Sequence, residues 1–140
     1  MLFTVLFIPR RKNMNRLEYH FDCLDGRCLF ICKFDEGSLN YDLESTIAEI
    51  PASFGELSRD DSELFNKYIA QANIPGWEKE YEPVLSKIED GIKWKVKLNL
   101  DGKEYVSKGE ESYEPYGYED FIKAMKLCVP KAGYFMAESE

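Results

Sequence analysis

The pair Asp25-Gly26 separates two stretches in which apolar and polar residues alternate, and together they span residues 16–35. Asp-Gly between alternating apolar residues is a strong signal for a β-hairpin, because both central residues of a type I′ turn need a positive φ angle. The sequence therefore predicts an antiparallel hairpin centred on this pair.

A turn at Asp25-Gly26 fixes which residues of the two strands lie opposite each other. On one face the paired residues are all apolar or aromatic, which predicts that this face packs in the core. Its predicted pairs are Cys23 with Cys28, Phe21 with Phe30, Tyr19 with Cys32 and Leu17 with Phe34. The other face is predicted to carry two pairs of opposite charge, which sheets favour. These are Glu18 with Lys33 and Arg16 with Asp35.

A second pair, Asp101-Gly102, predicts another hairpin over residues 92–108. One face carries the predicted pairs Leu98 with Tyr105 and Val96 with Ser107, and Trp94 shares it. Lys95 and Lys97 point to the other face. One packed face and one solvated face are typical of an antiparallel sheet that helices cover on one side.

Two further segments have helical patterns. Ser58 and the acidic residues after it predict a helix start, and Pro75 lies near its predicted end. The apolar stripe of this helix is Leu64, Phe65, Tyr68, Ile69 and Ala72. The second helix is predicted from Tyr118 to Cys128, where Pro130 stops it. Its inward residues are Phe121, Ile122, Met125 and Cys128.

The remaining segments complete an α+β fold. Residues 40–44 are predicted to form a third strand, residues 77–90 a connection with one short strand or turn, and residues 131–140 a loose tail. The predicted architecture is an antiparallel sheet, made from two Asp-Gly hairpins and one or two further strands, with two helices packed on one face. A ββα unit used twice would give this order. With 140 residues, the chain has the size of a single domain, 1–140.

The chain opens with an apolar run, Met1–Ile8, which the basic segment Pro9–Lys12 ends. The run is too short to span a bilayer, which needs about 20 residues. It also lacks the cleavage site and the preceding positive charge of a signal peptide. We interpret residues 1–13 as an extension, an extra strand or an apolar tail that packs on a neighbouring molecule.

The charge of the chain restricts its partners. The 26 acidic residues outnumber the 18 basic ones, which gives a net charge of -8. This charge disfavours direct contact with nucleic acid or with an anionic membrane. A basic protein surface is a more suitable partner, although surplus carboxylates also keep a chain soluble. In the absence of a secretory signal, we expect a cytoplasmic protein.

The four cysteines, Cys23, Cys28, Cys32 and Cys128, do not have the spacing of a zinc site. Buried, reduced thiols are the simplest interpretation. Because the predicted register places Cys23 opposite Cys28, a strained cross-strand disulfide that senses redox conditions is the alternative.

The sequence contains no Gly-rich phosphate loop, no G-x-S-x-G element and no H-E-x-x-H pattern. Its one histidine, His20, is predicted in mid-strand on the outward face of the first hairpin. Paired carboxylates such as Asp60-Asp61 and Glu119-Asp120 coincide with predicted helix starts, where the helix dipole accounts for them. We therefore predict no catalytic residue, no metal and no cofactor.

The segment Glu110–Asp120, EESYEPYGYED, has three tyrosines among five carboxylates. Tyrosine offers a large, rigid contact area and glycine lets a loop adapt, which is typical of protein-binding surfaces. The predicted partner-binding residues are Tyr113, Glu114, Tyr116 and Tyr118, with Glu78, Glu80 and Glu82 nearby in an acidic aromatic patch. The alternative is that the tyrosines only cover the helix ends and the sheet edge.

Four short elements follow one another in the second half of the chain. They are Trp77 with Tyr81 (W-x-x-x-Y), Asp90-Gly91 with Trp94 (DG-x-x-W), Ser107 with Gly109 (S-x-G), and Tyr113 to Pro115, where Glu114 interrupts a Tyr-Pro element. With these elements, the segment from Leu64 to Val129 resembles a family of short, uncharacterised bacterial domains. The resemblance covers roughly half of the chain. It supports the fold prediction and assigns no catalytic residue, since the family has no established activity.

These observations favour a non-enzymatic binding protein, an acidic module that engages a basic partner. Toxin immunity proteins and phage-encoded inhibitors of nucleases share this size and charge. The alternative is a small-ligand carrier or small enzyme with a pocket between sheet and helices, which a deep pocket lined by His20 or by Trp77 and Trp94 would favour. A third hypothesis is an assembly subunit whose interface is the apolar N-terminal run.

Overall fold

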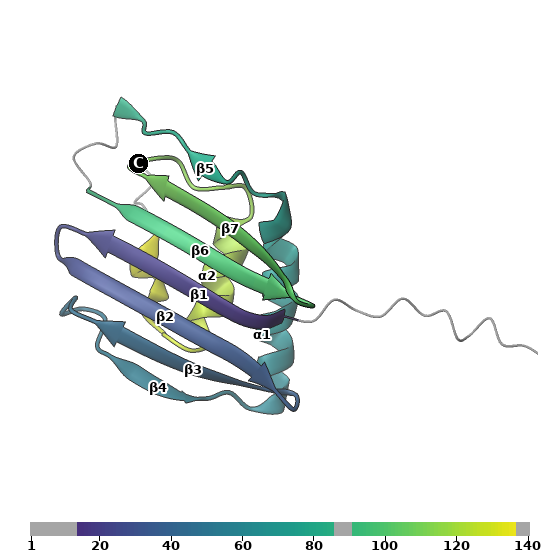
Figure 1. Ribbon diagram of the computed structural model, residues 1–140. Coiled ribbons are helices and arrows are strands. Elements are labelled where there is room, and N and C mark those ends of the chain that lie inside the picture. Colours follow the sequence, from purple (N-terminus) through teal and green to yellow (C-terminus); the bar gives the residue numbers. More distant parts are fainter. Residues whose placement is uncertain (1–13, 86–90, 137–140) are drawn as a thin grey trace, which may run out of the picture.

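The computed structural model describes residues 14–85 and 91–136, which form a seven-stranded sheet with two α-helices on one face (Figure 1). The strands are β1 (Met14–Cys23), β2 (Gly26–Asp35), β3 (Ser38–Ser45), β4 (Ser53–Glu56), β5 (Glu80–Tyr81), β6 (Lys93–Leu100) and β7 (Lys103–Glu110). The helices are α1 (Arg59–Ala72) and α2 (Tyr118–Lys126), with the short 3-10 helices η2 (Ile74–Gly76) and η4 (Ala132–Phe135).

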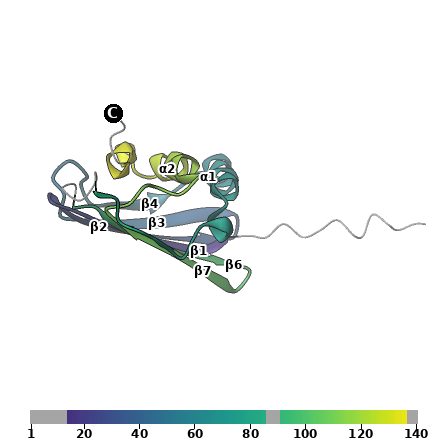
Figure 2. The same cartoon turned by 90° about the horizontal axis from the view of Figure 1, so that it is seen from above.

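The sheet has the strand order β4-β3-β2-β1-β6-β7-β5, and β1 therefore lies at its centre. All neighbouring strands are antiparallel except β5 and β7, which run parallel. Figure 2 shows α1, α2 and η4 on one side of the sheet, and no described helix covers the other side. This arrangement confirms the α+β prediction. Four strands precede α1, so the described elements do not follow a ββα unit used twice.

The predicted faces of the first hairpin are confirmed, but its predicted pairs are wrong. The turn residues are Leu24 and Asp25, and Phe21 lies opposite Cys28. A Cβ atom on Gly26 would lie 2.6 Å from the hydroxyl oxygen of Thr46. Glycine therefore leaves room for this threonine at the start of β2. The pairing is shifted by two residues, which changes every partner and leaves every residue on its predicted face.

The charged face of this hairpin changes partners in the same way. Arg16 lies opposite Lys33, and Glu18 lies opposite Ile31. On the other side of β1, Glu18 faces Lys97 of β6, and their charged groups are 3.9 Å apart. The negative charge of Glu18 is therefore balanced by a strand that is distant in sequence.

The second hairpin agrees with its prediction. Leu98 lies opposite Tyr105 and Val96 opposite Ser107. Asp101 and Gly102 have φ angles of 49° and 85°, the left-handed values of a type I′ turn. A turn at Glu36 and Gly37 has similar φ angles of 49° and 84° and joins β2 to β3. The predicted third strand is thus confirmed, and it is longer than predicted. It forms a hairpin with β2 that the residue pattern did not predict.

Helix α1 begins at the predicted cap. The hydroxyl oxygen of Ser58 accepts a hydrogen bond from the Asp61 N–H at 3.1 Å, which satisfies one of the free donors of the first turn. Ser62 on the buried side of α1 accepts a hydrogen bond from the Leu39 N–H of β3 at 2.9 Å. The helix is therefore tied to the sheet by a polar contact as well as by its apolar stripe.

The core between β1 and α2 is rich in aromatic rings. Tyr19 packs edge-on against Phe121 and Phe135, with ring centroids 4.9 and 5.3 Å apart. The Tyr118 hydroxyl donates to the Phe135 carbonyl at 3.2 Å and lies 2.5 Å from the Tyr19 hydroxyl. Because the single proton of Tyr118 goes to this carbonyl, Tyr19 donates to Tyr118. The two buried hydroxyls are both satisfied.

The predicted loose tail is wrong for residues 131–136. Helix α2 ends at Lys126, before the predicted end at Cys128 and four residues before Pro130. The chain then continues as η4, in which Ala132 and Phe135 are buried. The Tyr134 hydroxyl donates a hydrogen bond to the Asp25 carboxylate in the first hairpin turn. These contacts return the chain to the core. The predictions for residues 137–140 and 1–13 lie outside the described residues.

The buried tyrosines and thiols predict a loss of stability in alkali. Burial raises the pKa of Tyr19 and Tyr118 above the ordinary value of 10.0, and that of Cys128 from 9.0 to about 12. In the unfolded chain these groups have their ordinary pKa values. Above about pH 9 the unfolded chain therefore loses protons that the folded protein still holds, and this difference favours unfolding. We expect the urea midpoint to be constant up to that pH and to fall above it. Tyr118→Phe should reduce this pH dependence, and an equal slope in both proteins would contradict the assignment.

Candidate protein-binding site

The loop between β7 and α2, residues 111–117, displays two tyrosines. Tyr113 is 61% exposed and Tyr116 is 100% exposed, whereas Ser112 and Pro115, the residues just before them, are buried. The alternation means that the small residues hold the loop against the protein while the tyrosines point outward. Two exposed tyrosines on one loop match the composition of protein-binding surfaces and make this loop the candidate site.

Both ends of this loop are held by hydrogen bonds. The Glu111 N–H donates to the Ile92 carbonyl at 2.7 Å, and the Glu111 carbonyl accepts from the Val84 N–H at 2.8 Å. At the other end, the Tyr118 N–H donates to the Pro115 carbonyl at 3.0 Å. The exposed tyrosines therefore stand on a backbone with fixed ends, and ordering it for binding costs little entropy.

Gly117 brings the end of the loop against α1. Its φ angle is 96°, and a Cβ atom there would lie 2.3 Å from the Ala72 carbonyl oxygen. Only glycine adopts this conformation without strain and leaves room for the carbonyl. The close approach fixes Tyr116 beside the end of α1.

Tyr118 does not belong to this surface, and its prediction as a partner-binding residue is wrong. It is 2% exposed, and its ring packs against Trp77, Trp94 and Phe121. As the first residue of α2, it is turned toward the sheet by the helix. For Tyr118, the alternative interpretation of a tyrosine that covers a helix end agrees with its burial at the start of α2.

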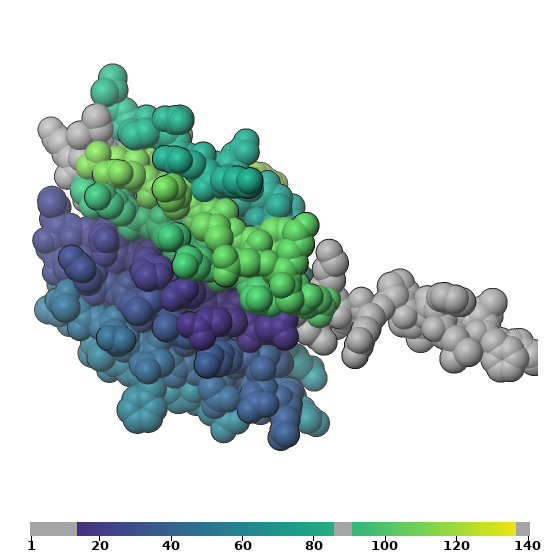
Figure 3. All heavy atoms as spheres, viewed as in Figure 1, coloured from purple at the N-terminus to yellow at the C-terminus, as the bar shows by residue number. Residues whose placement is uncertain are grey.

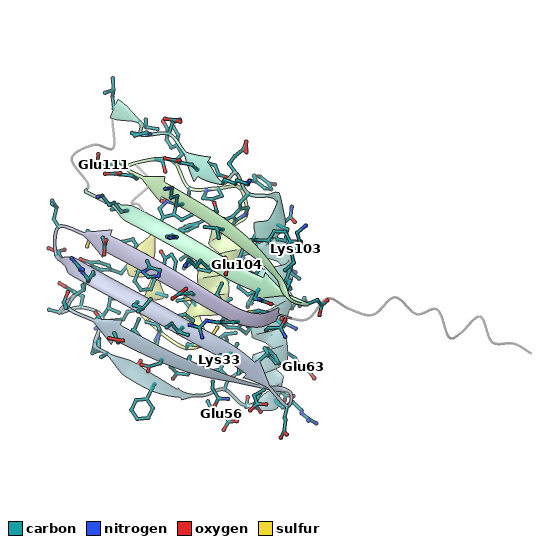
Figure 4. All side chains as sticks on the ribbon, viewed as in Figure 1. Lys33, Glu56, Glu63, Lys103, Glu104 and Glu111 are labelled. Carbon is teal, nitrogen blue, oxygen red and sulfur yellow. The ribbon has the colours of Figure 1, made fainter. Side chains whose placement is uncertain are left out.

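The acidic segment before β6 lies beside this loop. Glu80 and Tyr81 of β5 pair in parallel with Lys108 and Gly109 of β7, so residues 78–81 run along the edge of the sheet. Their acidic side chains are exposed, as is that of Glu82. Figure 3 shows the teal atoms of this segment against the green atoms of β7 along one edge. Figure 4 shows Glu111 at the end of β7 on the same edge.

We call this surface the acidic edge. Its members are Glu78, Glu80, Glu82, Glu110, Glu111, Tyr113, Glu114 and Tyr116. The Glu110 carboxylate forms an ion pair with Lys93, with a distance of 3.4 Å between the charged groups. These six carboxylates lie beside three lysines, Lys79, Lys93 and Lys108. The excess of negative charge favours a basic surface.

Among the residues that carry the predicted family resemblance, a part lies in one packed cluster: Trp77, Tyr81, Trp94, Ser107 and Gly109. The ring centroid of Trp94 lies 6.1 Å from that of Trp77 and 5.8 Å from that of Tyr81, and its backbone pairs with Gly109. Ser107 donates a hydrogen bond to the Glu78 carbonyl at 2.6 Å. These residues hold β5 against β7. Their role is to support the acidic edge from inside.

His20 lies on the uncovered face of the sheet, as predicted. Its side chain is 43% exposed and lies 3.7 Å from the Glu18 carboxylate. The hollow beside it is about 330 Å³ and is surrounded mainly by charged side chains of β1, β6 and β7. Among residues 14–85 and 91–136, no group of three histidine, cysteine or carboxylate side chains is placed to hold a metal ion.

The cysteines do not form the predicted cross-strand pair. Cys23 lies opposite Gly26, and the Cys28 thiol instead donates a hydrogen bond to the Ser45 hydroxyl at 3.2 Å. Cys28, Cys32 and Cys128 are buried, and burial raises the pKa of all three thiols. A raised pKa disfavours the reactive thiolate. The hypothesis of a redox-sensing disulfide between Cys23 and Cys28 loses its geometric basis.

A search with the full sequence finds no matching model of a protein family and no similar sequence among curated proteins. The resemblance of residues 64–129 to short bacterial domains therefore stays a prediction. Within the part of the chain that the structure covers, no helix has the length and apolar character needed to cross a membrane.

Proposed function

We propose that this chain is a small, non-enzymatic binding module that engages a basic protein through its acidic edge. The observation that carries the proposal is the display of Tyr113 and Tyr116 on a loop in which Ser112 and Pro115 are buried. Tyrosine is frequent among the residues that dominate binding energy at protein interfaces. Carboxylates around these two tyrosines add specificity for a positively charged partner. An inhibitor or immunity-type protein is one biological setting for this surface.

The alternative of a ligand carrier or small enzyme has weaker support. Trp77 and Trp94 pack against each other with ring planes 85° apart, and they fill the core beside α2. His20 lies on the opposite side of the sheet in a shallow charged hollow. Trp94 also lines this hollow but is only 4% exposed, so little of its ring is available to a ligand.

Capture from a cell lysate tests the proposal. The immobilised protein is expected to retain basic proteins, and the double variant Tyr113→Ser, Tyr116→Ser is expected to lose them. The affinity for an isolated partner should fall about 30-fold or more, because truncation of one dominant interface residue costs about 2 kcal/mol or more. Retention should also weaken with salt, since exposed charges are screened.

Phe54→Ser provides the matched control. Phe54 is 83% exposed on β4, at the other edge of the sheet. This variant removes an equally exposed aromatic ring and should bind as the original protein does. Thermal unfolding should be similar for all three proteins, because surface substitutions have small effects. Equal capture by the double variant and the original protein would disprove the proposed surface.

A further inference from the structure

A large hollow lies between α1 and the end of β6. Its volume is about 1010 Å³, and it runs along α1 from Asp60 to Pro75. The apolar side chains that line it are Leu64, Ile69, Ala70, Pro75, Leu98 and Leu100. We call this hollow the α1 groove. An apolar groove of this size on a small protein is characteristic of a docking site.

The α1 groove lies where the chain enters the described structure. Met14, the first residue of β1, is buried and lies opposite Leu100, which lines the groove. Figure 2 shows α1 above the end of the sheet at which β1 begins and β6 ends. Met14 therefore lies at the border of the groove.

The sequence before Met14 matches the groove in chemistry. Met1–Ile8 is an apolar run, and Arg10, Arg11 and Lys12 follow it. Beside its apolar residues, the groove is lined by Asp60 and Glu63 near the start of α1 and, further along the helix, by Asn66, Lys67 and Asn73. Within the described residues, neither carboxylate has a basic group within ion-pair distance. We propose that residues 1–8 occupy the α1 groove of the same molecule, with the basic residues beside Asp60 and Glu63.

The dimensions agree with this placement. Eight residues in an extended conformation span about 26 Å, and the 14 residues of α1 span about 21 Å. The five residues from Pro9 to Asn13 reach at most about 17 Å. The apolar run can therefore lie along the groove while its connection returns to Met14. Such a short connection keeps the run at a high effective concentration, which favours its own groove over that of a second copy.

Methyl NMR spectra of the full chain and of a variant without residues 2–8 test this placement. Removal of the run should shift the methyl signals of Leu64, Ile69, Leu98 and Leu100. The signals of Leu43 and Ile122, which lie in the core away from the groove, should stay in place. A synthetic peptide of residues 1–12 should restore the original groove signals when it is added to the shortened protein.

Two matched changes test the chemistry. The peptide with Leu2→Ser, Leu6→Ser and Phe7→Ser should restore nothing, because it keeps the charge and loses the apolar surface. Asp60→Asn with Glu63→Gln should weaken the binding of the unchanged peptide, by up to about fivefold per charge pair. An equal affinity of both peptides would overturn the proposal.

A variant of the full chain keeps the test informative if the shortened protein precipitates. Ala70 is exposed on α1 and lines the groove. Ala70→Arg should displace the run and shift the same groove signals, with helix content unchanged by circular dichroism. Unchanged groove signals in this variant would disprove the proposal. A dimer in light scattering that disappears with residues 2–8 would also disprove it, because the run would then join two molecules.

Discussion

Phe135→Ala is expected to lower the free energy of unfolding by about 3–5 kcal/mol, the usual cost of truncating a buried phenylalanine. Phe135 is 1% exposed, and its ring packs against Tyr19 and Phe21 with centroids 5.3 and 5.0 Å away. Its carbonyl also accepts the hydrogen bond of the buried Tyr118 hydroxyl. Urea denaturation followed by tryptophan fluorescence measures the change.

Lys131→Ala is the control for this prediction. Lys131 lies just before η4 and is exposed, so its truncation should change stability by about 0.5 kcal/mol or less. A similar small effect for Phe135→Ala would mean that the end of the chain is loose, as the sequence pattern alone suggests. The contrast between the two variants thus separates packing in the core from a general effect of changes near the terminus.

Gly117→Ala is expected to destabilise the protein through two effects at once. The φ angle of 96° costs a residue with a Cβ atom about 1–3 kcal/mol. The new Cβ atom would also lie 2.3 Å from the Ala72 carbonyl oxygen, so either α1 or the loop must move. We expect a lower thermal midpoint. We also expect weaker partner binding, because Tyr116 is next to the displaced residue.

Gly102→Ala isolates the first of these effects. Gly102 has a similar φ angle of 85°, but a Cβ atom there would meet no atom within 4 Å. Its substitution should cost only the backbone strain. If both alanine variants lose the same stability, the close approach of the loop to α1 contributes nothing, and the argument for a fixed Tyr116 fails.

The acidic edge shows how far residue patterns could predict a site. Tyr113 and Tyr116 are exposed as the composition of residues 110–120 indicates, and the acidic segment with Glu78 and Glu80 does lie alongside. Tyr118 has the same residue type and the same acidic neighbours in sequence, yet it is buried. Composition describes a segment, whereas the direction of each side chain depends on where the helix begins and on what it packs against.

The two Asp-Gly pairs also show the difference between what a local pattern predicts and what tertiary packing decides. Asp101-Gly102 forms the predicted type I′ turn, and its register follows. Asp25-Gly26 has the same two residues, but there Thr46 packs against Gly26 and the turn moves to Leu24 and Asp25. A contact with a residue twenty positions away decides between two turns that local preferences alone do not separate.

By itself, the sequence determined the α+β class, the faces of the two hairpins and the start of α1 at Ser58. These features depend on interactions between residues that are close in the chain: the period of two in a strand, and the hydrogen bond between a cap and the first turn. Only the tertiary structure decided the register of the first hairpin, the burial of Tyr118 and Phe135, and the position of the α1 groove beside Met14. These depend on atoms from segments far apart in sequence, whose packing no local pattern encodes.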